Sequence, residues 1–182
     1  MRILEKIKTV LVSPKNFFQE MKREKGLKKA FLFSVLLSPI SILVGMLLNI
    51  PDSYGVAVAN ALAFLPYHFA ASIAFLSGWL LTVLLPFVIA TIYHIFALAL
   101  KGKGKYEASY KAAVYSNTPS YLLGWLWFPF SLIVTLWSFA LSVLGLKAPH
   151  ALKLHKAFLV AVSPYAILFL LTLATILVAG SV

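Results

Sequence analysis

Side chains that could catalyse a reaction or hold a metal ion are scarce in this sequence. It contains no Cys and only four His, which excludes a thiolate nucleophile and any Cys-based metal site. His94 lies about 10 Å along a helix from Lys101, which favours an interfacial position over a buried proton relay. His150 and His155 are placed by the sequence in a cytoplasmic loop, and their spacing of five suits no helical metal site. We expect neither a metal site nor a cofactor.

Nucleophiles also lack the partners that they need. No Gly-x-Ser-x-Gly elbow is present. The stretch 102–105, Gly-Lys-Gly-Lys, is only superficially similar to a phosphate-binding loop, which needs a longer Gly-rich turn followed by Lys and then Ser or Thr. We interpret it as a flexible cytoplasmic turn whose lysines fix the topology. The sequence therefore predicts a protein that is not an enzyme.

The distribution of charge identifies the class of protein. The chain of 182 residues is 62% hydrophobic and 12% charged, whereas soluble domains are about 45–50% apolar and about 25% charged. All charged residues except Asp52 lie in 1–29, 101–111 and 147–156. This pattern excludes a soluble enzyme, a fibrous repeat and a disordered chain. The basic residues that give the chain its net charge of +11 flank apolar runs, which favours a membrane surface over nucleic acid as the partner.

The basic segments also predict the topology. A membrane-spanning helix needs about 20 mostly apolar residues, and a Lys or Arg at its centre costs roughly 2.5–3.5 kcal/mol. If all three basic segments are cytoplasmic, the apolar runs 30–100 and 112–146 each cross the membrane twice, and the run 157–182 crosses it once. We predict an all-α, polytopic transmembrane bundle of five spans in the cell membrane, with the N-terminus in the cytoplasm and the C-terminus outside. The predicted spans are about 30–50, 73–100, 108–124, 126–146 and 157–179.

Two parts of this topology have open alternatives. The segment of about 51–72, marked by Asp52, is predicted on the outer side, either on the membrane or dipping into it. The run 112–146 must supply two helices of about 17 residues, the lower limit for a crossing. Aromatic residues around its midpoint Gly124 favour an apex at the outer interface. A single long helix is the alternative, and it would place Lys147 outside.

Residues 1–29 form a basic amphipathic segment that precedes the transmembrane domain 30–182. Apolar residues recur there at helical spacing, with Arg2, Glu5, Lys6 and Lys8 on the opposite face, as in a helix that lies in the membrane interface. Ser13 and Pro14 predict the start of a second helix, and Gly26 its end. The predicted contacts with lipid or a partner are Phe17, Phe18, Lys22, Arg23, Lys28 and Lys29. Packing of these helices on the protein's own cytoplasmic face is the alternative.

Polar and small residues within the spans give further candidates. Ser38, Thr118 and Ser163 each precede a proline, where a hydroxyl can satisfy the carbonyl that proline leaves without its donor. Asn117, Thr118 and Pro119 form a candidate intramembrane polar site, although hydrogen bonding between helices is the commoner use of such residues. Ala70, Ala74 and Gly78 form a helix-packing stripe.

Three stretches share the pattern of a known family. They are Ser-Pro followed by Phe-Phe at 13–18, the Gly-x-Gly, aromatic, Tyr/Ser and Pro run at 102–119, and Gly-Leu, His and Lys-Ala at 145–157. The chain resembles the Yip (Ypt/Rab-interacting protein) domain family of five-span membrane proteins, in its short prokaryotic form. The resemblance implies a five-helix bundle with a cytoplasmic N-terminus.

The family's eukaryotic members are linked to Rab-type GTPases and vesicle traffic, and its short prokaryotic members lack an assigned activity. GTPase binding is implied here by the resemblance alone. The eukaryotic motif Asp-Leu-Tyr-Gly-Pro is absent, and the nearest sequence, at 52–55, is predicted on the outer side.

The leading functional hypothesis is a non-catalytic membrane protein that organises the membrane or recruits partners at its basic cytoplasmic face. Its expected partners are anionic membrane lipids and other membrane proteins or a second copy, and not nucleic acid. The first alternative is a transporter or channel for a neutral or lipidic molecule, because the spans lack the charged group that moves ions. The second is an accessory subunit of a membrane complex, docked through the small-residue stripe.

Overall fold

The computed structural model describes residues 2–48 and 53–179, and the described elements are all helical. Along the chain they are α1 (Ile3–Val12), α2 (Pro14–Glu20), the 3₁₀ helix η1 (Met21–Arg23), α3 (Lys28–Leu47), α4 (Ser53–Ala61), α5 (Tyr67–Ala99), α6 (Tyr106–Ser116), α7 (Thr118–Leu123), α8 (Phe130–His150) and α9 (Leu154–Ala179). The all-α membrane bundle predicted from the sequence is confirmed.

Four described helices, α3, α5, α8 and α9, are long and apolar enough to cross a membrane. The short helices α6 and α7 follow one another in the region of the predicted third span, and the five-span count stays a prediction. The segment predicted on the outer side contains α4 and the first turn of α5, where His68 is exposed. The predicted marker of that segment, Asp52, lies outside the described residues.

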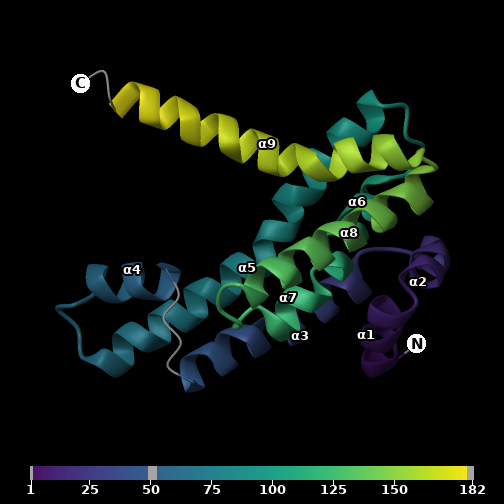
Figure 1. Ribbon diagram of the computed structural model, residues 1–182. Coiled ribbons are helices and arrows are strands. Elements are labelled where there is room, and N and C mark those ends of the chain that lie inside the picture. Colours follow the sequence, from purple (N-terminus) through teal and green to yellow (C-terminus); the bar gives the residue numbers. More distant parts are fainter. Residues whose placement is uncertain (1, 49–52, 180–182) are drawn as a thin grey trace.

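Helix α6 is the centre of the bundle. It packs against α3, α5 and α8, while α9 covers α8 and α5. All residues from Ser109 to Ser116 are buried, including Ala112 and Ala113, whose small side chains let neighbouring helices approach closely. Figure 1 shows α1 and α2 at one end of the bundle, whereas α4 and the C-terminal half of α9 diverge at the other.

The outer faces of the long helices are apolar. Leu80, Leu84 and Val88 on α5 are about half exposed, and Leu168 and Leu171 on α9 are more than half exposed. A water-soluble fold would bury such side chains, but a lipid-facing surface requires them because the surrounding solvent is hydrocarbon. The packed core therefore lies toward the end that carries α1 and α2.

Hydroxyl groups satisfy carbonyls near two prolines, as the sequence predicted. Ser163 Oγ donates to the carbonyl of Val160 at 2.7 Å, and Thr118 Oγ1 donates to that of Tyr115 at 2.7 Å. Each carbonyl belongs to the residue four before a proline, whose missing N–H would otherwise have been its donor.

The prediction is wrong for Ser38. The carbonyl freed by Pro39 belongs to Val35, and it accepts a hydrogen bond of 3.2 Å from Trp79 Nε1 of α5. Ser38 Oγ is buried without a hydrogen-bond partner within the described residues. A donor from a neighbouring helix has replaced the local one, so this bond also joins α3 to α5.

We expect Trp79→Phe to lower the free energy of unfolding by about 1–3 kcal/mol, because the substitution leaves the Val35 carbonyl unsatisfied in a dry environment. Unfolding of the purified chain in mixed micelles, followed by circular dichroism, measures the change. Trp127→Phe is the matched control, since Trp127 is 69% exposed. Equal destabilisation by the two substitutions would contradict the assignment.

Candidate functional site

Helices α1 and α2 are docked on the bundle through their aromatic residues. Phe17 and Phe18 are 2% and 0% exposed, and the ring of Phe17 meets that of Tyr115 edge to face at 5.0 Å. The prediction that Phe17 and Phe18 contact lipid or a partner is therefore corrected: the bundle itself covers them. The alternative, packing on the protein's own face, is what the structure shows.

Gly145 of α8 makes room for this docking. A methyl group added to Gly145 would lie 2.9 Å from Cε1 of Phe18 and 3.1 Å from Cβ of Ala112. Only a residue without a side chain allows α2 to approach α8 so closely. The glycine of the third sequence motif thus accommodates Phe18 of the first motif.

A buried ion pair fastens the same segment. Lys6 Nζ lies 2.9 Å from Glu24 Oε2 and 2.6 Å from the hydroxyl of Tyr115, which donates in turn to Glu24 Oε1 at 3.0 Å. Lys6 is only 7% exposed, so its predicted place on the outward face of α1 is wrong. The side chains of Glu24 and Tyr115 supply the charge and the hydrogen bonds that a buried ammonium needs.

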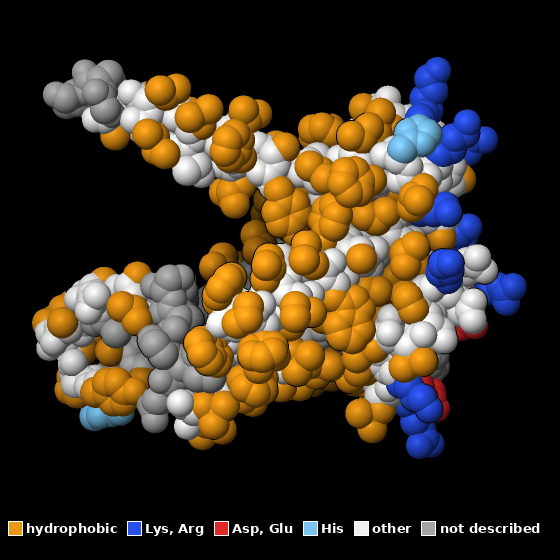
Figure 2. Space-filling view, viewed as in Figure 1, with side chains coloured by type: hydrophobic (Ala, Val, Ile, Leu, Met, Phe, Trp, Pro, Cys, Tyr) orange, Lys and Arg blue, Asp and Glu red, His pale blue; other side chains and the backbone are white. Residues whose placement is uncertain are grey.

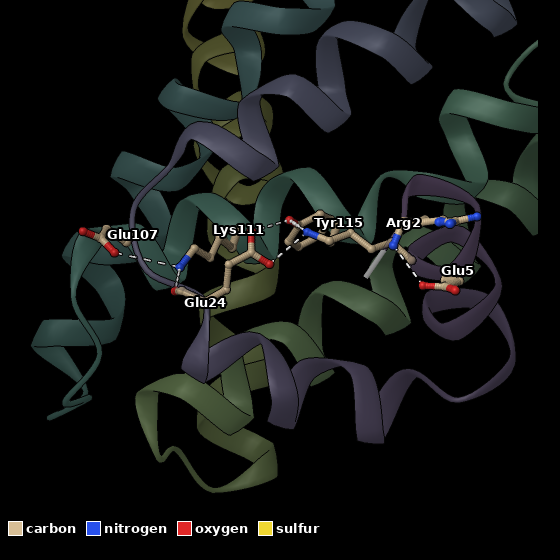
Figure 3. Close-up of polar contacts among 7 residues, drawn as sticks. Arg2, Glu5, Glu24, Glu107, Lys111 and Tyr115 are labelled. Carbon is tan, nitrogen blue, oxygen red and sulfur yellow. Dashed lines mark hydrogen bonds and ion pairs between the residues drawn. The ribbon is translucent and has the colours of Figure 1, made fainter.

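Lys111 extends this network along α6, outside the four candidate spans (Figure 3). Its Nζ donates to the carbonyl of Glu24 and lies 3.8 Å from Glu107, whose Oε2 accepts the N–H of Gly26 at 3.0 Å. Burial lowers the pKa of Lys111, and the two carboxylates oppose that shift. Burial and the Glu24 charge raise the pKa of the Tyr115 hydroxyl, which keeps it a proton donor.

A second polar cluster joins two histidines that the sequence analysis treated separately. His150 is fully buried at the end of α8 rather than in a loop, and its Nε2 lies 2.9 Å from Ser109 Oγ. The rings of His94 and His150 are 6.2 Å apart, centre to centre. Within the described ranges no third His, Cys, Asp or Glu joins them.

The turn between α5 and α6 closes over this pair. A methyl group on Gly104 would lie 2.5 Å from Nδ1 of His150, and Lys103 N–H donates to the carbonyl of His150 at 3.0 Å. The turn is therefore tightly packed, not the flexible turn that we expected. The Gly-x-Gly spacing was visible in the sequence, but its partner lies more than 40 residues away on α8.

The remaining predicted surface residues are available for contact. Lys22, Arg23, Lys28 and Lys29 are all exposed. Figure 2 shows that Lys and Arg side chains gather at the end of the molecule where α1 and α2 lie. We call this surface the basic face, formed by the cations of 2–29, 101–105 and 147–156 other than the buried Lys6. Of the described carboxylates, Glu5 and Glu20 are exposed, and the side chain of Glu107 is 45% exposed beside Lys111.

The intramembrane candidates occupy packed positions. Thr118 and Pro119 are buried and Asn117 is half-buried, at the junction of α6 and α7. The Thr118 hydroxyl is used by the Tyr115 carbonyl. A ligand role for these residues stays a prediction.

The small-residue stripe begins in a buried position. Ala70 is buried, and Ala74 and Gly78 are half-buried, on α5, which packs against α3 and α4. Its use as a docking surface for a partner also stays a prediction.

The comparison with family models finds a match that covers most of the chain. The model of the Yip1 domain matches residues 8–176. The chain belongs to the Yip1 domain family. No curated protein and no solved structure matches it. Together with its long apolar helices, this membership makes the chain an integral, multi-pass membrane protein.

The motifs by which this Yip1 domain resembled its family meet in space. Phe18 lies on Gly145, and Gly104 lies against His150. Tyr115 of the central run binds the N-terminal segment. The three separate stretches therefore build one continuous core, and their side chains act mainly in packing.

We expect Tyr115→Phe to weaken the docking of α1 and α2 by about 1.5–3 kcal/mol, because a buried ion pair loses its shared hydroxyl. Hydrogen exchange of the α2 amides, measured by mass spectrometry, should become roughly tenfold faster or more. Tyr110→Phe is the control, since Tyr110 is equally buried on α6 and its hydroxyl makes no hydrogen bond to the described residues of the N-terminal segment. Similar exchange in both variants would contradict the role of the network.

We expect Gly104→Ala to destabilise the protein by about 1–3 kcal/mol, because the new methyl overlaps a buried ring that cannot move freely. Gly45→Ala serves for comparison, since its methyl would meet only Cβ of Trp125 at 3.7 Å. The thermal midpoint in detergent should fall for the first variant and hold or rise for the second. A fall of equal size in both would show that the His150 contact does not matter.

Proposed function

We propose that this protein is a non-catalytic member of its family that organises anionic lipid, or recruits partners, at its basic face, which lies in the cytoplasm. The observation that carries the proposal is the gathering of exposed cations at one end of an apolar bundle (Figure 2). Each cation near an anionic membrane surface contributes roughly 1 kcal/mol to attraction.

The docking of the N-terminal segment supports this proposal. Because Phe17, Phe18 and Lys6 are held in the core, the exposed Lys22 and Arg23 belong to a short helix of fixed position. Cations on an ordered surface lose less side-chain and backbone entropy on binding than the same cations on a flexible tail. The basic face is thus preorganised to bind anionic groups.

Helix α1 also presents exposed apolar side chains to the membrane interface. Ile3, Leu4 and Val12 are 40%, 79% and 72% exposed, although the opposite side of the helix is buried. Exposed apolar residues beside cations are typical of a helix that lies in the headgroup region. These residues would set how deeply the basic face lies in the headgroup region of the membrane.

The test uses the full chain in proteoliposomes. Energy transfer from a fluorophore on the chain to labelled phosphatidylglycerol should exceed that to labelled phosphatidylcholine. Replacement of Lys22, Arg23, Lys28 and Lys29 by Gln should remove most of this excess, because roughly 1 kcal/mol per cation is lost.

The matched control keeps the charge and changes the shape, with Lys22, Lys28 and Lys29 replaced by Arg and Arg23 by Lys. It should retain the enrichment of phosphatidylglycerol. Unchanged enrichment in the Gln variant would overturn the proposal.

A further inference from the structure

An open groove lies on the basic face, between the α2–η1 segment and the end of α8. Its volume is about 720 Å³. Four cations line it: Lys15 of α2, Lys22 and Arg23 of η1, and Lys147 of α8. Leu144 and Leu152 are among the apolar residues that complete its wall.

The four cations are held together without internal compensation. No Asp or Glu belongs to the lining that the described residues form. None of the four cations has an ion-pair or hydrogen-bond partner among the described residues. They converge because Phe18, between Lys15 and Lys22 in sequence, is buried against Gly145, two residues before Lys147. The fold thus concentrates positive charge that an anion can neutralise.

The end of α8 that forms one wall of the groove is capped by its own backbone. Ala151 closes the helix in the left-handed conformation, at φ 53°, and the N–H of Leu152 donates to the carbonyl of Lys147 at 3.1 Å. That carbonyl, at the negative end of the helix dipole, is therefore occupied and repels an anion less than a free one would. Lys147 also compensates the dipole from the last turn.

An apolar track leads away from the groove along α8. Ile133, Trp137, Ala140 and Leu144 follow one another at intervals of four, three and four residues, which places them on one side of the helix. The first three are exposed and Leu144 is half-buried. A free phosphate or an acidic peptide would have no use for this track, whereas an acyl chain would lie along it.

We infer that the groove binds one anionic phospholipid, with its phosphate among Lys15, Lys22, Arg23 and Lys147 and an acyl chain along Ile133, Trp137 and Ala140. Phosphate is well matched to this set, because the Arg guanidinium donates in pairs and the ammonium groups act as point charges. The inference rests on the proposed function and gives its basic face a defined lipid site.

Native mass spectrometry of the full chain, released from detergent with added lipid, tests the site. The wild type should retain one phosphatidylglycerol in preference to phosphatidylcholine. Lys15→Gln with Lys147→Gln should weaken retention roughly thirtyfold, the effect of two near-surface cations. Lys28→Gln with Lys29→Gln removes the same charge from the same face outside the groove, and it should weaken retention of the single bound lipid clearly less than the groove variant does.

The outcomes separate the site from the wider function. Equal weakening by both double variants would overturn the site and leave a diffuse attraction to the basic face, as the proposed function requires. No weakening by either would overturn both. All four substituted lysines are exposed, and an unchanged thermal midpoint confirms that the variants fold.

Competition distinguishes the occupants. Inorganic phosphate or glycerol 3-phosphate, added at the concentration of the lipid, should not displace phosphatidylglycerol, because neither carries an acyl chain. Displacement by them would assign the site to free phosphate and overturn the lipid. Displacement by an oligoglutamate peptide would assign it to an acidic protein partner, again overturning the inference.

Discussion

The ammonium of Lys6 is buried where the N-terminal segment meets the centre of the bundle, and the fold has to neutralise it. Removing such a charge from water costs several kcal/mol, which only close partners can offset. Glu24 and Tyr115 are those partners, one from beyond α2 and the other from α6. Both must be in place at once, so the whole segment from α1 to Glu24 folds back onto α6 as a unit.

The arrangement of the basic face follows from this docking. With the segment fixed, the ring of Phe18 fills the space above Gly145 and the ring of Phe17 packs on Tyr115. The chain then turns into α3 through Gly26, whose φ is 73°. The cations that remain outside then lie beside those of the α5–α6 turn and of α8. An interfacial helix that was free to leave the protein would present the same charges without order.

Hydrogen bonds between residues close together in the chain could be predicted from the sequence. Ser163 and Thr118 bond to carbonyls three residues earlier, within one helical turn of a proline, so the sequence contained donor and acceptor together. Ser38 has the same sequence context, but the prediction was wrong there because Trp79 of another helix donates to the Val35 carbonyl instead. His94 and His150 likewise meet only through the packing of α5, α6 and α8, and their spacing in the chain carried no signal of it.

The sequence by itself determined the class of protein, the all-helical bundle and the family. Transfer of apolar residues into a membrane and exclusion of charge from it are nearly additive along the chain, so composition and order suffice. Only the tertiary structure decided which face of the N-terminal helices is outward. The sequence predicts Lys6 as a surface residue and Phe18 as a lipid contact. Both are buried because they pack against residues about 110 to 130 positions away in the chain, Tyr115 and Gly145. The groove between η1 and α8 has the same origin, since its cations come from segments that nothing but the folded bundle brings together.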